Sequence, residues 1–268
     1  MGWDPLRGMN AGNSAGAQHF AGSLSIVIGG NQGLGAGIAS RLGELGSDLV
    51  LLGRNQDTLA DTAKAIRGMG VSVTARSVDI RNVDALVGNL EEVIAEFGAP
   101  RVLVNSAGGT LKKPALEVSP AEWDVVIDTH LRGTFFACQA VGRAMVDAGY
   151  GKIVNLSSVW ATSAAQDRSV YSIAKAGVAQ LTAALAVEWG PFGVRVNSVA
   201  PSATVTPRVL LRHEQDPDAA RYSIERIPLG RLAEVRDVVE AAIYLASESS
   251  DFVTGHALYV DGGWRSAK

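Results

Sequence analysis

Short apolar runs alternate along the chain with longer segments whose apolar residues recur at helical spacing. A run of this length, rich in Val, Ile and Leu and bounded by turn residues, is typical of a strand. Seven such runs lie at residues 24–29, 48–53, 71–77, 101–105, 152–157, 194–200 and 256–260. Helical periodicity is found at residues 33–46, 55–68, 82–97, 119–148, 170–190 and 234–247. The pattern therefore predicts strands and helices in alternation.

The predicted strands are apolar throughout rather than on alternate residues. Such strands belong to a parallel sheet that is covered on both faces, and helical crossovers are the connections that a parallel sheet needs. We therefore expect an α/β fold with a single-domain, Rossmann-type, doubly wound parallel sheet of seven strands. No internal repeat or linker divides the chain into further domains.

Two segments fall outside this alternation. Residues 1–23, rich in Gly, Ala, Asn and Ser, are predicted to form a flexible N-terminal arm ahead of a catalytic domain at 24–268. A tail without function is one interpretation of the arm, and docking of Trp3 and Phe20 on a neighbouring subunit is the other. The proline-interrupted segment 201–230 is predicted to be a substrate loop, because long excursions in compact domains are often binding loops.

Composition narrows the class of partner. The chain has 268 residues, 47% of them hydrophobic, and a formal net charge of -3, so it lacks the basic surface that nucleic acid requires. No signal peptide and no apolar run long enough to span a membrane is recognised. The single cysteine, Cys138, lies in an apolar stretch and is expected to be a buried thiol. We expect a cytoplasmic protein that acts on small molecules and needs no metal.

The stretch GGNQGLGAG at residues 29–37 joins the first predicted strand to the first predicted helix. Glycine allows a tight turn and a close approach of the backbone to a ligand. The helix that follows offers unpaired N–H groups and the positive end of its dipole to a pyrophosphate. Gly29, Gly33 and Gly35 therefore predict a dinucleotide site, although any tight turn between strand and helix favours glycine.

Tyr171 and Lys175 are four residues apart and so share one face of the predicted helix. A lysine ammonium within about 4 to 6 Å favours the phenolate form, which makes tyrosine a usable general acid or base. Ser158 ends a predicted strand at the edge where open α/β sheets bind ligands, and its hydroxyl can donate to the same substrate oxygen. Taken singly, each feature has a structural alternative, a helix surface pair or a turn-forming serine.

These motifs occur together, in order, over residues 24–263, and in this the chain resembles the short-chain dehydrogenase/reductase family. The resemblance rests on the glycine turn, Asp79 in SVDI, NSAG at 105–108, Ser158, YSIAK at 171–175, VRVNSVAP at 194–201 and the final VDGGW. The last part of the chain is similar to the 3-oxoacyl-carrier-protein reductase and gluconate 5-dehydrogenase branches. Departures from the family pattern are Ile28, Ser106 and Ser202.

The resemblance implies a set of site residues. The catalytic residues would be Ser158, Tyr171, Lys175 and His130. His130 stands where the family carries an asparagine that organises a proton relay, so it either carries protons itself or packs without a chemical role. The cofactor-binding residues would be Gly29, Asn31, Gln32, Gly33, Leu34, Gly35, Arg54, Asn55, Asp79, Ile80, Asn105, Ala107, Gly108, Tyr171, Lys175, Pro201, Thr204 and Thr206. It also implies a homotetramer built through the helices at 119–148 and 170–190 and the C-terminal strand.

The implied function is an NAD(P)-dependent oxidoreductase that transfers a hydride to or from a secondary alcohol or ketone of the sugar acid, polyol or 3-oxoacyl type. The alternative is a nucleotide-binding redox sensor or scaffold without turnover. NADP(H) is favoured over NAD(H), because Arg54 stands at the end of the second strand, where an enzyme built for NAD carries an acid.

Residues outside these motifs bear on the substrate. Gly109, Trp160 and the 203–226 segment would shape the substrate site, although Trp160 is equally well explained by core packing. The arginines of the segment would meet an anionic substrate or form a solvated helix face. They are Arg208, Arg212, Arg221 and Arg226.

Overall fold

The computed structural model describes residues 19–267, and of residues 208, 212, 213, 217, 219 and 220 it describes the backbone alone. Seven parallel strands form one sheet in the order β3-β2-β1-β4-β5-β6-β7. The strands are β1 (Leu24–Ile28), β2 (Asp48–Gly53), β3 (Val73–Ser77), β4 (Val102–Asn105), β5 (Gly151–Leu156), β6 (Val194–Pro201) and β7 (Ala257–Val260). The order reverses between β1 and β4, so the prediction of a doubly wound sheet is confirmed.

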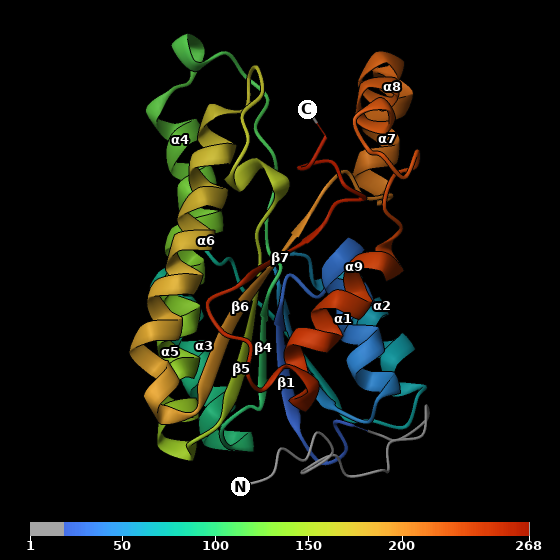
Figure 1. Cartoon of the computed structure of the whole chain (residues 1–268). Helices are drawn as coiled ribbons and strands as arrows, with labels where there is room; N and C mark the ends of the chain where they lie inside the picture. The colour runs from blue at the N-terminus through green and yellow to red at the C-terminus, as the bar shows by residue number, and fades with distance from the viewer. Residues whose placement is uncertain (1–18, 268) are drawn as a thin grey trace, which may run out of the picture.

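Helices cover both faces of the sheet (Figure 1). One layer contains α1 (Gly33–Glu44), α2 (Gln56–Arg67) and α9 (Val235–Ala246), and the other contains α3 (Val83–Phe97), α5 (Gly133–Ala148) and α6 (Ser169–Trp189). Successive residues of a strand point to opposite faces. Val27 accordingly packs in the core beneath the first layer, whereas Ile26 and Ile28 pack beneath the second. Burial on both faces explains why the strands are apolar throughout.

The segment predicted as one helix over 119–148 is divided. It consists of α4 (Pro120–Ile127), a single π-helical turn η2 (Asp128–Arg132) and α5. α4 begins at a capping box in which Ser119 and Glu122 each accept from the other's backbone N–H. Single π turns inside helices are often found at functional sites, and η2 carries His130.

The 201–230 segment contains two helices, α7 (Pro207–Gln215) and α8 (Pro217–Glu225), where the sequence indicated only an irregular excursion. Both stand beyond the carboxyl ends of the strands, across the top of the molecule from α4 (Figure 1). Each helix starts at a proline, a residue favoured in the first helical turn. The prolines that interrupt the pattern therefore mark two helix starts.

Phe20 is 2% exposed and packs in the core beneath α1. Its backbone N–H donates to the carbonyl of Leu45 at 3.0 Å. Phe20 thus packs inside its own chain rather than docking on a neighbouring subunit. Trp3 lies outside the described residues.

One helix departs from the expectation that no segment could span a membrane. Residues Ser169–Phe192, which include α6, are long and apolar enough by length and composition alone. The core helix of a globular domain meets the same criterion, and α6 packs against β6 with Val178, Leu185 and Ala186 buried. The core explains these buried residues, whereas Ile173 and Val187 of the same helix are exposed.

Candidate active site

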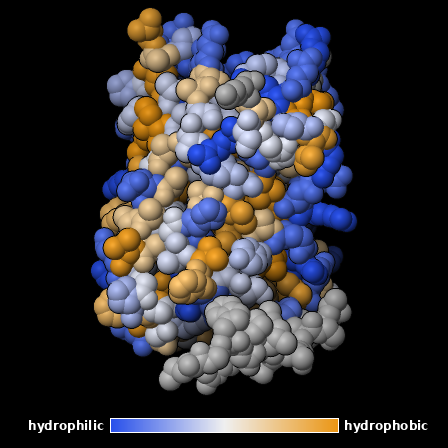
Figure 2. Space-filling view, viewed as in Figure 1, coloured by the Kyte–Doolittle hydropathy of each residue, from blue (hydrophilic) through white to orange (hydrophobic). Residues whose placement is uncertain are grey.

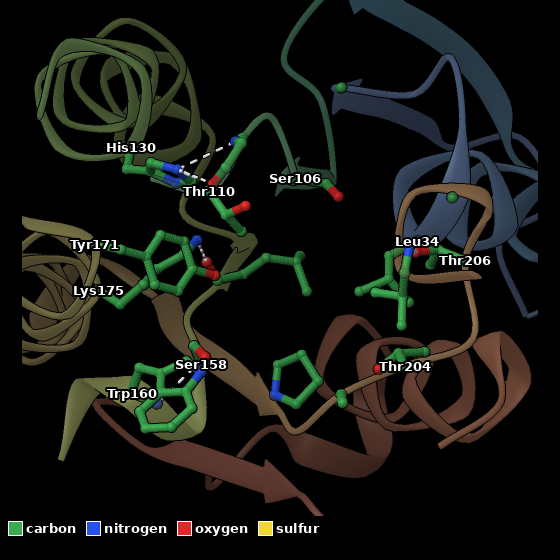
Figure 3. A pocket seen from close by; sticks show the side chains of 18 of the residues that line it. Leu34, Ser106, Thr110, His130, Ser158, Trp160, Tyr171, Lys175, Thr204 and Thr206 are labelled. Carbon is green, nitrogen blue, oxygen red and sulfur yellow. Dashed lines mark hydrogen bonds between the residues drawn. The ribbon is translucent and has the colours of Figure 1, made fainter. Parts of the chain in front are cut away.

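A cavity of about 1110 Å³ opens at the carboxyl ends of the strands (Figure 3). Its lining comes from the β1–α1 turn, the ends of β2, β4, β5 and β6, η2, α6 and the α7–α8 segment. Ligand pockets for drug-sized molecules are usually somewhat smaller, roughly 300 to 1,000 Å³. This cavity therefore has room for a dinucleotide and a small substrate together.

The glycine turn closes tightly on the neighbouring strand end. Gly29 has a φ of +83°, and a Cβ there would lie 2.6 Å from the backbone nitrogen of Ala107. Gly33 has a φ of +56° and lines the cavity. The positive φ favours glycine at both positions, and at Gly29 there is also no space for a Cβ. The turn thus brings bare backbone to the cavity wall.

The N-terminus of α1 differs from those of the next two helices. Asn55 caps α2 by accepting from Thr58 N–H at 2.9 Å, and Asn82 caps α3 through a side-chain bond from Ala85 N–H. At α1 the N-cap residue is Gln32, whose side chain makes no capping bond, and the first turn has no acidic residue. The N–H groups there can bind an anion.

The far end of the cavity is lined by residues that follow β2 and β3. Arg54 is exposed, and within residues 19–267 no carboxylate forms an ion pair with its guanidinium. Asp79 pairs with Arg81 at 2.6 Å, and this hydrogen bond lowers the pKa of the Asp79 carboxyl. Asn31 donates to the Thr58 hydroxyl at 3.0 Å, which fixes the turn beside Arg54.

Lys175 is buried beneath Tyr171 on α6. Its Nζ donates to the carbonyl of Leu156 at 2.6 Å and lies 5.8 Å from the centre of the Tyr171 ring. Burial lowers the pKa of Lys175 to about 7. The predicted pairing is confirmed in its geometry, since the two side chains lie on one helix face within the cavity (Figure 3).

Ser158 lies two residues beyond the end of β5 and is the N-cap of the 3₁₀ turn η3 (Val159–Ala161). Its Oγ accepts from the N–H of Trp160 at 3.3 Å. This bond uses a lone pair of the hydroxyl and leaves its proton to donate to another acceptor. Ser158 and Tyr171 both line the same part of the cavity (Figure 3).

The buried imidazole of His130 packs against both Tyr171 and the chain after β4. Its ring meets the Tyr171 ring edge-on, with centroids 5.4 Å apart. Its Nε2 lies 2.8 Å from the carbonyl oxygen of Gly109 and 3.2 Å from the nitrogen of the same residue. A Cβ at Gly108 would collide with the imidazole. His130 therefore connects the Tyr171 helix to the 108–109 turn.

Most of the predicted site residues line the cavity, and two do not. Gly35 is a packing position, because a Cβ there would meet the backbone of Gly29. Asn105 is buried below the cavity and donates to Asn155 Oδ1 at 2.9 Å. The cavity lining includes Gly29, Asn31, Gln32, Gly33, Leu34, Arg54, Asn55, Asp79, Ile80, Ala107, Gly108, His130, Ser158, Tyr171, Lys175, Pro201, Thr204 and Thr206.

Further predictions concern the residues expected to shape the substrate site. Trp160 and Gly109 line the cavity, as do Tyr222 and Trp264, to which sequence reasoning gave no role. Trp264 belongs to the VDGGW motif, and this motif was the feature of the sequence that could have indicated a role for Trp264 in the site. Of the four arginines, the two whose side chains are described, Arg221 and Arg226, are not part of the cavity lining. Arg221 pairs with Asp218, Arg226 donates to the hydroxyl of Tyr222, and the side chains of Arg208 and Arg212 lie outside the described part.

Two further predictions concern reactive groups. Cys138 is fully buried, and burial raises the pKa of its thiol to about 12, so it is an inert core residue as expected. Among residues 19–267 no cluster of three or more His, Cys, Asp or Glu side chains could hold a metal ion.

Comparison with known proteins places these motifs in a wider group. A family model described as "Enoyl-(Acyl carrier protein) reductase" matches residues 28–265. The chain is 32% identical to gluconate 5-dehydrogenase of Gluconobacter oxydans (strain 621H), over 91% of this chain and 95% of the relative. It is 38% identical to galactitol 2-dehydrogenase (L-tagatose-forming) of Cereibacter sphaeroides, over 91% and 95% of the two chains.

A solved structure is similarly close. It is a protein of Agrobacterium tumefaciens, provisionally identified as a 2-deoxy-D-gluconate 3-dehydrogenase and containing bound NADP. The TM-score is 0.86 and the identity 32%, and the match covers 93% of this chain and 98% of the other. The fold is therefore shared over nearly the whole described length.

Proposed function

The chain belongs to the short-chain dehydrogenase/reductase family and is an NAD(P)-dependent oxidoreductase, and from this premise we propose the reaction and the residues that carry it. The reaction is hydride transfer between the cofactor and a secondary alcohol or ketone. The observation that supports it is the meeting of Ser158, Tyr171 and Lys175 in one cavity with an uncapped helix N-terminus.

The residues present fit a nicotinamide dinucleotide. A Cβ at Gly33 would point toward Thr206, 3.7 Å away, so the absence of a side chain keeps the turn open toward the cavity. The N–H groups at the start of α1, around Gly33 and Leu34, would hold the pyrophosphate. Arg54 would bind the 2′-phosphate of NADP(H), which we propose as the preferred cofactor. A relative with bound NADP supports this preference.

The remaining cofactor-binding residues are proposed from the cavity lining. Asn55, Asp79 and Ile80 border the adenosine end, and Ala107 and Gly108 border the middle. Pro201, Thr204 and Thr206 line the wall beyond β6. Asn105 would act indirectly, because its amide is bonded to Asn155 in the core. Gly35 would act by letting α1 approach the glycine turn.

A bound nicotinamide supplies or accepts the hydride at the carbon of the alcohol or ketone. In reduction, the Tyr171 hydroxyl gives its proton to the carbonyl oxygen, and in oxidation the phenolate takes the alcohol proton. Ser158 donates its hydroxyl proton to the same oxygen and holds it in place, since its lone pair already accepts from Trp160 N–H. A charged Lys175 favours the phenolate form of Tyr171.

His130 is proposed to position Tyr171 and, through its ring, to influence proton transfer. Its edge-on contact with Tyr171 and its bonds to the 108–109 turn support this role. Replacing His130 with Asn should move the pH profile of kcat, because an imidazole can take up and release a proton and an amide cannot. A profile unchanged by the substitution would reduce His130 to a packing residue.

The substrate class is proposed from the relatives together with the site. The named relatives act on gluconate and galactitol, a sugar acid and a polyol. We assign the chain to secondary alcohols and ketones of the sugar acid, polyol or 3-oxoacyl type. We also propose a cytoplasmic homotetramer. Hydrophobic side chains exposed on α4, α5 and α6 support the assembly, among them Trp123, Phe135 and Val187. On the face shown in Figure 2, hydrophobic residues are exposed among hydrophilic ones.

The activity is tested by mixing the protein with reduced cofactor and a panel of ketones, keto sugar acids and 3-oxoacyl esters. Oxidation of the cofactor coupled to formation of the alcohol is the expected result. A redox sensor of the same fold would bind the cofactor but oxidise none of it across the panel. If calorimetry showed tight cofactor binding and the panel showed no oxidation, the sensor function would be favoured over the enzyme function.

A further inference from the structure

Trp160 stands next to the reacting groups. Its backbone N–H bonds to Ser158 Oγ at 3.3 Å, and its side chain lines the cavity. Figure 3 shows its indole beside Ser158, with His130 on the other side of Tyr171. Any substrate whose oxygen reaches Ser158 and Tyr171 must therefore place its neighbouring atoms near this indole.

The indole is supported from behind by a second tryptophan. Trp264 is 6% exposed, and its ring meets that of Trp160 with centroids 5.1 Å apart and planes inclined by 72°. Val159 and Ile227 belong to the same buried cluster. We call Trp160 and Trp264 the aromatic corner.

The segment that carries Trp264 is itself fixed. The carboxylate of Asp261 accepts from the N–H groups of Gly263 and Arg265, each at 2.9 Å. The guanidinium of Arg226 lies 4.8 Å from the centre of the Trp264 ring and donates to the Tyr222 hydroxyl at 2.6 Å. Contacts from Asp261 and Arg226 thus fix the position of Trp264. A rigid aromatic surface loses little conformational entropy when it binds a ligand.

The described cations around this end of the cavity have partners, and they include Arg168, a buried residue of the lining that makes contacts within the chain. Lys112 lies 3.8 Å from the carboxylate of Asp216, and Arg221 lies 2.9 Å from that of Asp218. Arg226 is held against two aromatic rings. Among the side chains that the structure describes, the feature next to Ser158 is therefore an apolar aromatic face rather than a cation aimed at a carboxylate.

We propose that the aromatic corner selects substrates whose reacting carbon belongs to an apolar ring, that is, alicyclic ketones and the corresponding secondary alcohols, over open-chain ones. This inference rests on the proposed hydride transfer. The named relatives act on a sugar acid and a polyol, whereas the aromatic corner of this chain favours a cyclic, apolar substrate. A ring packs its whole face on the indole, and it has few rotors to freeze. An open chain of the same carbon number covers less of the indole and loses more conformational freedom.

The test compares cyclohexanone with 2-hexanone, two ketones of six carbons, in reduction by the wild type and by Trp160→Ala. We expect the wild type to have a kcat/KM roughly tenfold or more higher for cyclohexanone, the discrimination that apolar pockets commonly reach. Trp160→Ala should remove most of this ratio, mainly through KM, and Trp160→Phe should restore part of it. Phe97→Ala, an exposed aromatic residue outside the cavity lining, is the matched control and should leave the ratio unchanged.

Binding of cyclohexanol and 2-hexanol to Tyr171→Phe saturated with oxidised cofactor, followed by calorimetry, reads the same preference without turnover. Equal affinities for the two alcohols, or equal losses of kcat/KM for both ketones in Trp160→Ala, would contradict ring selection by the aromatic corner. Neither result would contradict the proposed hydride transfer. Ring-selective binding without reduction of any ketone would instead overturn the proposed function.

Discussion

At the scale of single residues, the site depends on a lysine whose position costs stability. Lys175 is buried, and burial lowers its pKa to about 7 from an ordinary value near 10.5. The unfolded chain therefore binds a proton at this residue more readily than the folded chain between these two pH values. Burial of Lys175 thus disfavours folding below pH 7, and this penalty is relieved as the pH rises from about 7 toward 10.5.

Lys175→Met should abolish turnover and yet stabilise the fold at low pH. The free energy of unfolding of the variant relative to the wild type should fall by roughly 2 to 3 kcal/mol between pH 7 and pH 9, since each pH unit is worth about 1.4 kcal/mol. Chemical denaturation at both pH values measures this change. Lys64→Met, at an exposed position on α2, should show none of it. A pH-independent difference for Lys175→Met would contradict the assigned burial cost.

Arg54 belongs to the same scale, because its exposed side chain directly follows β2 and lines the cavity, at the position where the ribose is predicted to bind. A charge-assisted hydrogen bond to the 2′-phosphate contributes about 1.5 to 3 kcal/mol. Arg54→Ala should therefore lower kcat/KM with NADPH by roughly ten- to a hundredfold and leave that with NADH unchanged. Steady-state kinetics with both cofactors provide the measurement. Equal losses with both, or a wild type that prefers NADH, would show that Arg54 does not bind the phosphate.

At the scale of elements, the strands and the main catalytic positions could be predicted from the sequence, because burial and residue spacing determine them. All seven strands were predicted within a few residues. The five inner strands are buried on both faces and so are mostly apolar, whereas the edge strands β3 and β7 are only partly buried. Ser158 and Tyr171 were predictable because a strand end and a helix face fix where they point. The π turn η2 was not predicted, since an extra residue in a helical turn leaves the hydrophobic pattern nearly unchanged.

Tertiary contacts explain the other misses. Asn105 ends a strand, as a ligand-binding residue would, but its amide turns into the core to meet Asn155. Trp264 faces the cavity only because β7 and the turn at Asp261 bring the C-terminal segment back to η3. A local pattern of apolar and polar residues does not predict where the side chains of Asn105 and Trp264 point.

An element-scale prediction concerns η5 (Glu248–Ser250), which is connected to β5 by side-chain contacts of Lys152. Asp251, directly after it, lies 2.8 Å from the Nζ of Lys152, whose side chain is fully buried in β5. Burial raises the pKa of Asp251, but the hydrogen bond and charge of Lys152 outweigh it, so the pKa lies below its usual value. The stabilisation is therefore present above about pH 4 and lost as the pH falls through the lowered pKa.

Asp251→Asn should lower the free energy of unfolding at pH 7 by about 1 to 3 kcal/mol, because it leaves the Lys152 ammonium buried without its counter-charge. Half-exposure of the Asp251 carboxylate keeps the figure below that of a fully buried pair. Urea denaturation at pH 7 and pH 3 should show a larger loss at pH 7, because the Asp251 carboxylate is partly protonated at pH 3. Asp61→Asn, exposed on α2, is the control. A loss of equal size at both pH values would contradict the ion-pair explanation.

At the scale of the whole molecule, α4, α5 and α6 expose several large hydrophobic side chains. Val187 is 79% exposed, and Trp123, Val125, Phe135 and Ile173 are also exposed. Such side chains gathered on one flank mark an interaction surface. We predict a homotetramer of roughly 112 kDa, four times the 28.0 kDa chain, and Val187→Glu together with Phe135→Glu should weaken it. Multi-angle light scattering that gave a monomer for the wild type would refute the assembly.

The central claim is that Tyr171 transfers the proton in a cofactor-dependent reduction. Tyr171→Phe removes only the hydroxyl, so the fold and the cofactor site should be unaffected. We predict unchanged cofactor affinity by calorimetry and a kcat lowered by roughly 10² to 10⁴, the usual contribution of a positioned acid or base. Tyr244→Phe, at a partly exposed tyrosine on α9, should keep full activity. A Tyr171→Phe enzyme that retained wild-type kcat in the same assay would contradict this account.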